Sequence, residues 1–149
     1  KFKWLLSKYI MKKMLNVLDL FCGAGGLSEG FKQAGFNVVL GIDNDESSLK
    51  TFKLNHSKTE TLNKDVSTVT KKDITSKIGN QKINIVIGGP PCQGFSMAGN
   101  RSEDDSRNVL FLEYVKYVEY YKPKLFMIEN VSYIYWSYFK KSTIFKLYI

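Results

Sequence analysis

Five short segments with strand-like patterns constrain the fold of this chain more than any other feature. They are residues 15–20, 36–42, 61–64, 83–87 and 125–128, and four of them run directly into a glycine or a carboxylate. Helical patterns cover residues 27–34, about 47–55 and 109–121, whereas residues 71–80 look like a polar surface segment. Strands that alternate with helices predict an α/β fold with a mostly parallel sheet, and 149 residues leave room for one domain.

The composition is that of a globular protein, with 44% hydrophobic residues and no apolar run near the roughly 20 residues of a membrane-spanning helix. Residues 1–10 are too short and too interrupted by lysine for a signal peptide. Cys22 and Cys92 each follow a strand-like run, which is not the pattern of a disulfide framework. These features predict a reducing, cytoplasmic compartment.

The net charge of +8 comes from the two ends of the chain. Residues 1–13 carry five lysines and residues 132–149 carry three, in both cases without an acidic residue, so residues 14–131 are balanced. A claim of nucleic-acid binding must therefore rest on motifs. Met11 or Met14 could be the natural start, and we expect residues 1–10 to be a non-native or irrelevant extension.

The loop after the fourth strand, Gly88-Gly89-Pro90-Pro91-Cys92, carries the strongest chemical signal. The glycines predict backbone conformations that other residues resist, and the prolines make a stiff turn without N–H donors. Cys92 is then presented at the carboxyl end of a strand, where its thiolate could act as a nucleophile. The alternative is a small buried residue beside a proline turn.

A second glycine loop, residues 21–26, lies between the first strand and a helix. Such a loop brings backbone N–H groups and a helix N-terminus to a ligand carboxylate or phosphate, although a lone Gly-x-Gly is often a mere turn. Ser28 stands where a dinucleotide fingerprint needs glycine or alanine, which disfavours NAD. Cys22 is expected to be a packing residue.

Together these motifs resemble those of the cytosine-C5 methyltransferases. The resemblance rests on the Pro-Cys-Gln string at residues 91–93, the Phe-x-Gly-x-Gly string at residues 21–25 and the Glu-Asn-Val string at residues 129–131. It implies an incomplete Rossmann-like fold that uses S-adenosylmethionine. It further implies that Cys92 attacks C6 of a flipped cytosine in duplex DNA, while Glu129 binds the base edge.

For each of several other polar residues, the sequence allows both a functional role and a purely structural one. Asp43, about 20 residues after the glycine loop, could bind ribose hydroxyls or cap the next helix, for which Asp45 is the better candidate. Asp65 would accept from the adenine amino group by resemblance, or could be an ordinary loop residue. His56, the only histidine, closes a helix and is expected to be structural, and no zinc site is expected.

Residues 97–108 have the composition of a lid over an active site, and the resemblance implies that this loop closes over DNA. Arg101 and Arg107 could bind DNA phosphates or be solvated surface residues. The aromatic residues of 109–121 read as helix core. The full set of expected cofactor contacts is Phe21, Gly23, Gly25, Leu27, Asp43, Asn44, Asp65, Val66, Pro91 and Leu110, and the expected DNA contacts are Gln93, Ser96, Arg101 and Arg107.

The resemblance covers residues 14–131, between an extension (1–13) and an atypical tail (132–149). Later segments of such enzymes, including the one that selects the DNA sequence, are missing, and we hypothesise that the tail is out-of-frame or truncation sequence. We therefore expect a damaged copy or one half of a split enzyme that needs a second chain. The alternatives are a non-catalytic half-domain that binds S-adenosylmethionine or a partner, and an RNA cytosine methyltransferase.

Overall fold

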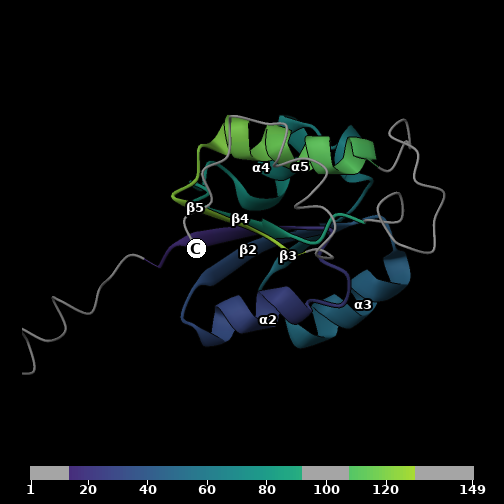
Figure 1. The fold of residues 1–149 in the computed structure, drawn as a ribbon. Helices are drawn as coiled ribbons and strands as arrows, with labels where there is room; N and C mark the ends of the chain where they lie inside the picture. The colour runs from purple at the N-terminus through teal and green to yellow at the C-terminus, as the bar shows by residue number, and fades with distance from the viewer. Residues whose placement is uncertain (1–13, 92–107, 130–149) are drawn as a thin grey trace, which may run out of the picture.

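The structure, a computed structural model, describes residues 14–91 and 108–129. In these ranges five strands form one sheet, with helices above and below it in the view of Figure 1. The strand order is β3-β2-β1-β4-β5, and every neighbouring pair is parallel. The predicted parallel α/β fold is thus confirmed. The strands are β1 (Asn16–Leu20), β2 (Asn37–Asp43), β3 (Glu60–Asn63), β4 (Ile85–Gly88) and β5 (Leu125–Ile128).

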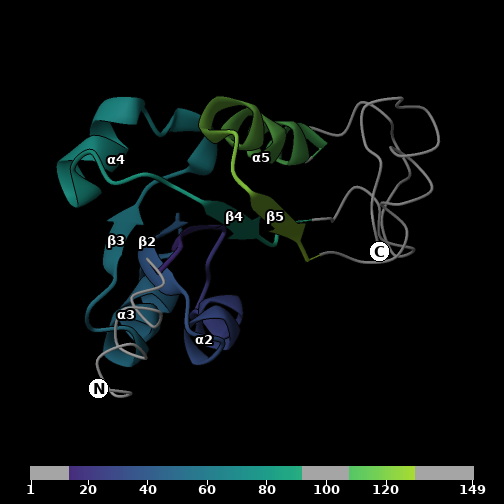
Figure 2. The same ribbon diagram turned by 90° about the vertical axis from the view of Figure 1, so that its left-hand side faces the viewer.

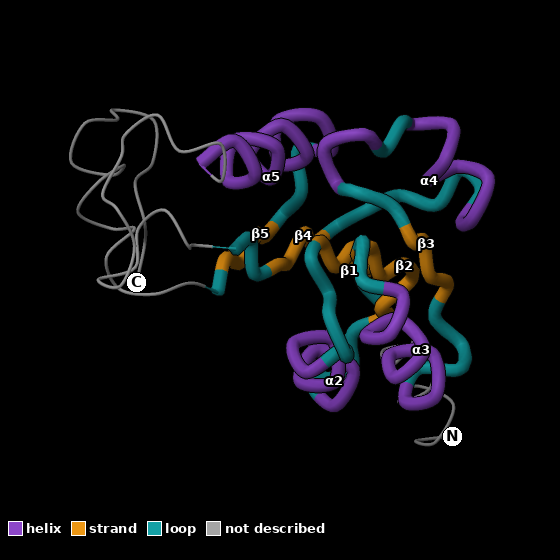
Figure 3. Tube along the Cα trace, turned by 90° about the vertical axis from the view of Figure 1, so that its right-hand side faces the viewer, coloured by secondary structure: helices purple, strands orange, loops and turns teal. Residues whose placement is uncertain are grey.

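Two pairs of helices cover the two faces of the sheet. Helices α2 (Gly26–Gln33) and α3 (Glu46–Asn55) lie on one face, and α4 (Lys71–Ile78) and α5 (Asn108–Tyr121) lie on the other (Figures 2 and 3). A short 3-10 turn, η1 (Val66–Thr68), follows β3. None of the helices in the described part of the chain is long and apolar enough to cross a membrane.

The core has two parts because both faces of the central strands are buried. On the α4 and α5 side, Leu18, Leu20 and Val86 pack with Tyr114 of α5. On the α2 side, Val17, Ile85 and Ile87 pack against partly buried residues of α2, among them Leu27. Near-continuous apolar strands are expected for a sheet covered on both sides.

The direction in which the chain adds strands reverses between β1 and β4. The chain runs from β1 outward to β3, then returns to place β4 on the other side of β1. Leu20, the last residue of β1, is paired with Ile42 of β2 and with Gly88 of β4. Such a switch point is where open α/β sheets bind ligands, at the carboxyl ends of the strands.

The segment at residues 71–80 corrects the sequence interpretation, because most of it is helix α4. Thr70 and Asp73 form a capping box, in which the Thr70 hydroxyl accepts from Asp73 N at 3.2 Å and the Asp73 carboxylate accepts from Thr70 N at 2.7 Å. Ile74 and Ile78, one turn apart, are buried in the core. The remaining residues of α4 are polar, and two apolar positions are too few to establish a helical period in the sequence.

The reason expected for the two glycines at the end of β4, Gly88 and Gly89, is also wrong. Neither Gly88 nor Gly89 is among the glycines with positive φ in the described residues. A Cβ at Gly88 would overlap the carbonyl oxygen of Leu20, and a Cβ at Gly89 would lie 3.1 Å from Glu129 Oε2. The two glycines therefore permit close packing rather than an unusual turn.

Candidate functional site at the switch point

The predicted site residues gather at one edge because parallel strands end on the same side of the sheet. The glycine loop follows β1, Asp43 ends β2, Asp65 lies two residues after β3, and Glu129 follows β5. Gly89 leaves β4 beside the end of β1, since Leu20 is paired with Gly88. Segments more than 60 residues apart in the sequence are thereby brought to one edge.

The glycine loop is a tight, hydrogen-bonded turn with three residues at positive φ: Phe21 at 58°, Gly23 at 51° and Gly25 at 93°. Gly25 N donates to Cys22 O at 2.9 Å, and Cys22 N donates to Ile42 O at 3.1 Å. Phe21, a non-glycine residue in the left-handed region, is the kind of strained position that clusters at binding sites. Among the described residues, nothing lies within 4 Å of a Cβ position at Gly23, so no described side chain covers this side of the loop.

Asp43 fastens the glycine loop to β2. Its Oδ2 accepts from Gly23 N at 2.8 Å and its Oδ1 accepts from Asp45 N at 2.9 Å. Asp45, in contrast, caps α3 by accepting from Ser47 N and Ser48 N, both at 3.1 Å. The expected capping role of Asp45 is confirmed, and Asp43 acts on the loop, which leaves its ribose role as a prediction.

The other expected cofactor residues differ in how they are placed. Asp65 caps η1 through Oδ1, which accepts from Ser67 N at 2.8 Å and from the Ser67 hydroxyl at 2.6 Å. Val66 is buried, Leu110 is partly buried in the first turn of α5, and Asn44 is exposed next to Asp43. Leu27 packs against the apolar cluster under the sheet, so its contact with a cofactor stays a prediction.

Glu129 reaches the start of the Pro-Pro-Cys loop. Its N–H donates to Gly88 O at 3.0 Å, and its carboxylate lies beside Gly89. Pro91, the last described residue before the predicted nucleophile, is exposed. Cys92 and the expected DNA contacts Gln93, Ser96, Arg101 and Arg107 lie outside the described residues, as does most of the predicted lid.

A buried carboxyl group under the glycine loop is not among the site residues that the sequence predicted. Asp19 of β1 is 1% exposed, and its Oδ2 accepts from the Ser28 hydroxyl of α2 at 2.6 Å. Burial, and secondarily the Asp43 carboxylate, raises the pKa of Asp19 to about 7, against the opposing effect of the Ser28 bond. The sequence does carry a signal for this residue, because Asp19 is the one acidic residue in an otherwise apolar strand end.

Cys22 behaves as the packing residue that the sequence predicted. It is buried with Leu49 and Phe52. Burial, followed by the nearby Asp19 and Asp43 carboxylates, raises the pKa of its thiol far above its ordinary value. A thiol that resists ionisation is a poor nucleophile.

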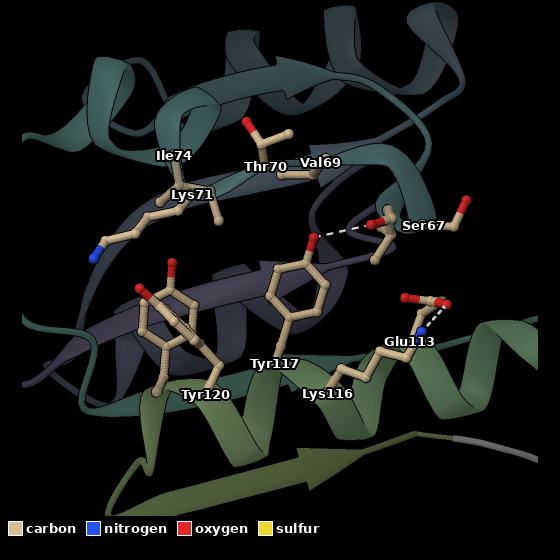
Figure 4. A pocket seen from close by; sticks show the side chains of 11 residues that line it. Ser67, Val69, Thr70, Lys71, Ile74, Glu113, Lys116, Tyr117 and Tyr120 are labelled. Atoms are coloured by element: carbon tan, nitrogen blue, oxygen red, sulfur yellow. Dashed lines mark hydrogen bonds and ion pairs between the residues drawn. The ribbon is translucent and has the colours of Figure 1, made fainter.

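The hollow of about 230 Å³ between η1, α4 and α5 is not the predicted cofactor site (Figure 4). Its lining includes Tyr117 and Tyr120, and the Tyr117 hydroxyl donates to Val66 O at 2.9 Å. Of the expected cofactor residues it includes only Val66. It therefore shares Val66 with the expected cofactor residues and none of their polar groups.

Comparison with known proteins identifies relatives of this chain. A model of the C-5 cytosine-specific DNA methylase family matches residues 15–145. The chain is 43% identical over 117 residues to type II methyltransferase M.DdeI of Desulfomicrobium norvegicum, a match that covers 78% of this chain and 28% of that protein. It is 50% identical over 117 residues to type II methyltransferase M.XorII of Xanthomonas oryzae, covering 77% and 28%.

Among solved structures, the chain resembles a DNA modification methyltransferase encoded within an E. coli prophage. The TM-score is 0.70 at 40% identity, and the match covers 80% of this chain and 33% of that one. These matches confirm the resemblance predicted from the motifs. The family match reaches residue 145, so the boundary drawn from motifs at residue 131 stays a prediction. The chain spans less than a third of the length of the two curated relatives above.

Proposed function

Because this chain belongs to the C-5 cytosine-specific DNA methylase family, we propose that it carries the cofactor-binding and nucleophile part of an enzyme that methylates C5 of cytosine in DNA. The observation that carries the proposal is the convergence of the glycine loop, Asp43 and Glu129 at one sheet edge. The loop that leads to Cys92 leaves the sheet at the same edge, next to the Glu129 carboxylate.

The glycine-loop site fits S-adenosylmethionine, which supplies an electrophilic sulfonium methyl group when bound. The open side of Gly23 leaves room for backbone approach, and the N-terminus of α2 favours a carboxylate such as that of the methionine part. The Asp43 carboxylate, oriented by Gly23 N and Asp45 N, has lone pairs left for ribose hydroxyls. Asp65 and Val66 would hold the adenine.

The chemistry proposed for this chain's own residues begins at Cys92. Its thiolate would add to C6 of a cytosine turned out of the duplex, which makes C5 nucleophilic. The Glu129 carboxyl would bind the base edge and share a proton with N3, and the covalent bond to Cys92 would break after C5 loses its proton. A nucleophilic thiol needs a reducing compartment, and the cytoplasm is our proposal for it.

A second chain that completes the domain is part of the proposal. β5 is an edge strand in the described sheet, and Leu125, Phe126 and Met127 are 49%, 36% and 36% exposed. Apolar residues on an edge strand favour association with further polypeptide. The chain also spans less than a third of the two curated relatives compared above. We therefore expect weak or no methylation by this chain alone.

The test is transfer of a labelled methyl group from S-adenosylmethionine to duplex DNA, with tRNA as the competing substrate. We expect activity only when a polypeptide corresponding to the rest of a relative is added, and expect Cys92→Ser to abolish it. Sequence-specific methylation by the chain alone would contradict the need for a partner. Methylation of tRNA in preference to DNA would overturn the proposal that DNA is the substrate.

The second candidate function is a half-domain that binds S-adenosylmethionine or a partner without catalysis. The exposed β5 favours it as much as it favours a split enzyme. Calorimetric binding of the cofactor, together with complementation that never restores methyl transfer, would select this candidate.

A further inference from the structure

The only histidine of the chain lies behind the glycine loop and contacts it directly. His56 caps the C-terminus of α3 and is 3% exposed. Its Nε2 lies 3.1 Å from Gly25 O, although the two residues are 31 positions apart in sequence. The ring packs on Phe52, with 4.5 Å between the ring centroids.

The hydrogen bond to Gly25 determines which ring nitrogen carries the proton. A carbonyl oxygen only accepts, so Nε2 must be the protonated nitrogen that donates. The other nitrogen, Nδ1, lies 3.7 Å from Glu29 Oε2 and has no hydrogen-bond partner in the described part of the chain. His56 therefore acts on the loop through Nε2.

Gly25 and Gly23 serve opposite sides of the loop. A Cβ at Gly25 would lie 2.5 Å from His56 Nε2 and 2.7 Å from Phe52 Cδ2, whereas a Cβ at Gly23 would meet no atom of residues 14–91 or 108–129 within 4 Å. The missing side chain of Gly25 thus makes room for the imidazole, and Gly23 leaves room on the open side.

Gly25 O is the atom at which the loop becomes a helix. It also accepts from Glu29 N at 2.9 Å, the first hydrogen bond of α2, and Gly25 caps that helix without a side chain. The loop is therefore held by Asp43 of β2 at Gly23 and by His56 of α3 at Gly25. We infer that His56 is a positioning residue that keeps the glycine loop in its ligand-binding shape.

The inference rests on the proposed function for the identity of the ligand, whereas the loop geometry can be tested without a ligand. Hydrogen exchange of the amides of residues 22–26 is measured in the full chain without cofactor, for wild type, His56→Leu and His56→Gln. Leucine keeps an apolar contact with Phe52 but cannot donate, whereas the glutamine amide can donate to Gly25 O. We expect leucine to speed exchange roughly tenfold and glutamine to stay within about threefold of wild type.

Amides of β1 and β4 in the same samples serve as the control for global loosening. Faster exchange confined to the loop supports the inference. Wild-type exchange in His56→Leu, or equal acceleration by both substitutions, would overturn it, because an ordinary packing role does not distinguish leucine from glutamine in this way.

Calorimetric titration with S-adenosylmethionine separates this inference from the proposed function. We expect His56→Leu to weaken binding roughly tenfold and His56→Gln to restore it. If neither the wild type nor the variants bind S-adenosylmethionine, the proposed function fails. The hydrogen-exchange result still decides the role of His56.

A measurement on wild type protects the test against a leucine variant that does not fold. With one histidine in the chain, the imidazole ¹⁵N signals are assigned without ambiguity. We expect the Nε2–H tautomer at pH 8, and an Nδ1–H tautomer would overturn the inference.

Discussion

At the scale of single residues, the carboxylates near the sheet edge lie in opposite electrostatic environments. Asp19 is buried with one hydrogen-bond donor, and its pKa is raised to about 7 mainly because burial disfavours the charged form. Asp45 and Asp73 lie at helix N-termini, where hydrogen bonds, chiefly from Ser48 and Lys64 respectively, lower the pKa of each carboxyl. An aspartate thus has a raised pKa where it is buried and a lowered pKa where it caps a helix.

We expect Asp19 to make the protein less stable as the pH rises from about 4 to 7. In that range the folded state retains a proton that the unfolded carboxyl, with a pKa near 3.8, has released. The free energy of unfolding should fall by up to about 4 kcal/mol, and then level off above pH 7. Asp19→Asn, a neutral mimic of the acid, should remove this slope in urea unfolding between pH 5 and 8.

Asp45→Asn is the control, because a group with a lowered pKa is ionised in both states above pH 5 and loses its contribution only at lower pH. An equally steep slope in wild type and Asp19→Asn would contradict the assignment.

Two neighbouring aspartates should separate ligand binding from helix capping. Asp43→Ala removes the acceptor for Gly23 N and the proposed ribose contact, so we expect S-adenosylmethionine binding to weaken at least tenfold. Asp45→Ala removes the α3 cap and should cost about 1 kcal/mol of stability with little change in affinity. Calorimetry and urea unfolding on both variants check this, and the reverse pattern would reassign Asp43 to a structural role.

At the scale of elements, α4 is held by its cap and by two buried isoleucines. The Thr70–Asp73 capping box fixes the N-terminus, and Lys64 Nζ pairs with Asp73 Oδ2 at 2.7 Å. Ile74 and Ile78 join the cluster that Tyr114 of α5 completes. The sequence between these positions is polar, so the cap and the tertiary contacts together define the helix.

Thr70→Ala should therefore destabilise the protein by about 1 kcal/mol, since the hydroxyl accepts from Asp73 N in the capping box. The measurement is the midpoint of urea unfolding. Thr75→Ala, in the middle of the same helix, is the matched control because its hydroxyl only donates to Lys71 O. Equal losses in the two variants would mean that the cap contributes nothing specific.

At the scale of the whole molecule, β5 is the most exposed part of the described sheet. It pairs with β4, and its residues Leu125, Phe126 and Met127 face solvent to more than a third of their surface. The central strands β1 and β4, by contrast, are buried. An apolar edge of this kind favours association between chains.

We expect the isolated chain to self-associate at micromolar concentration, and Leu125→Lys to shift it towards monomer in sedimentation velocity runs. Leu54→Lys is the control, because Leu54 is a leucine of α3 that is 83% exposed and distant in sequence from this edge. A monomeric wild type, or an equal effect of both substitutions, would show that β5 is not the associating surface.

Local patterns predicted most of the elements. The five strands, α2, α3 and α5 follow from short apolar runs, helical spacing and glycine or aspartate boundaries, and β5 lies where the pattern predicted it. The parallel order then brings Asp43 and Glu129 to one edge. Helix α4 was not predicted from the sequence because only two of its eight residues are buried.

The sequence by itself determined the family, the strands and the polar residues at their ends, because these depend on residue type and spacing along the chain. Only the tertiary structure decided that Gly25 accommodates His56, that Gly88 accommodates Leu20, and that Asp19 is enclosed beside Ser28. Each of these is a contact between segments from different elements, and the space or the electric field at such a contact depends on how the segments pack.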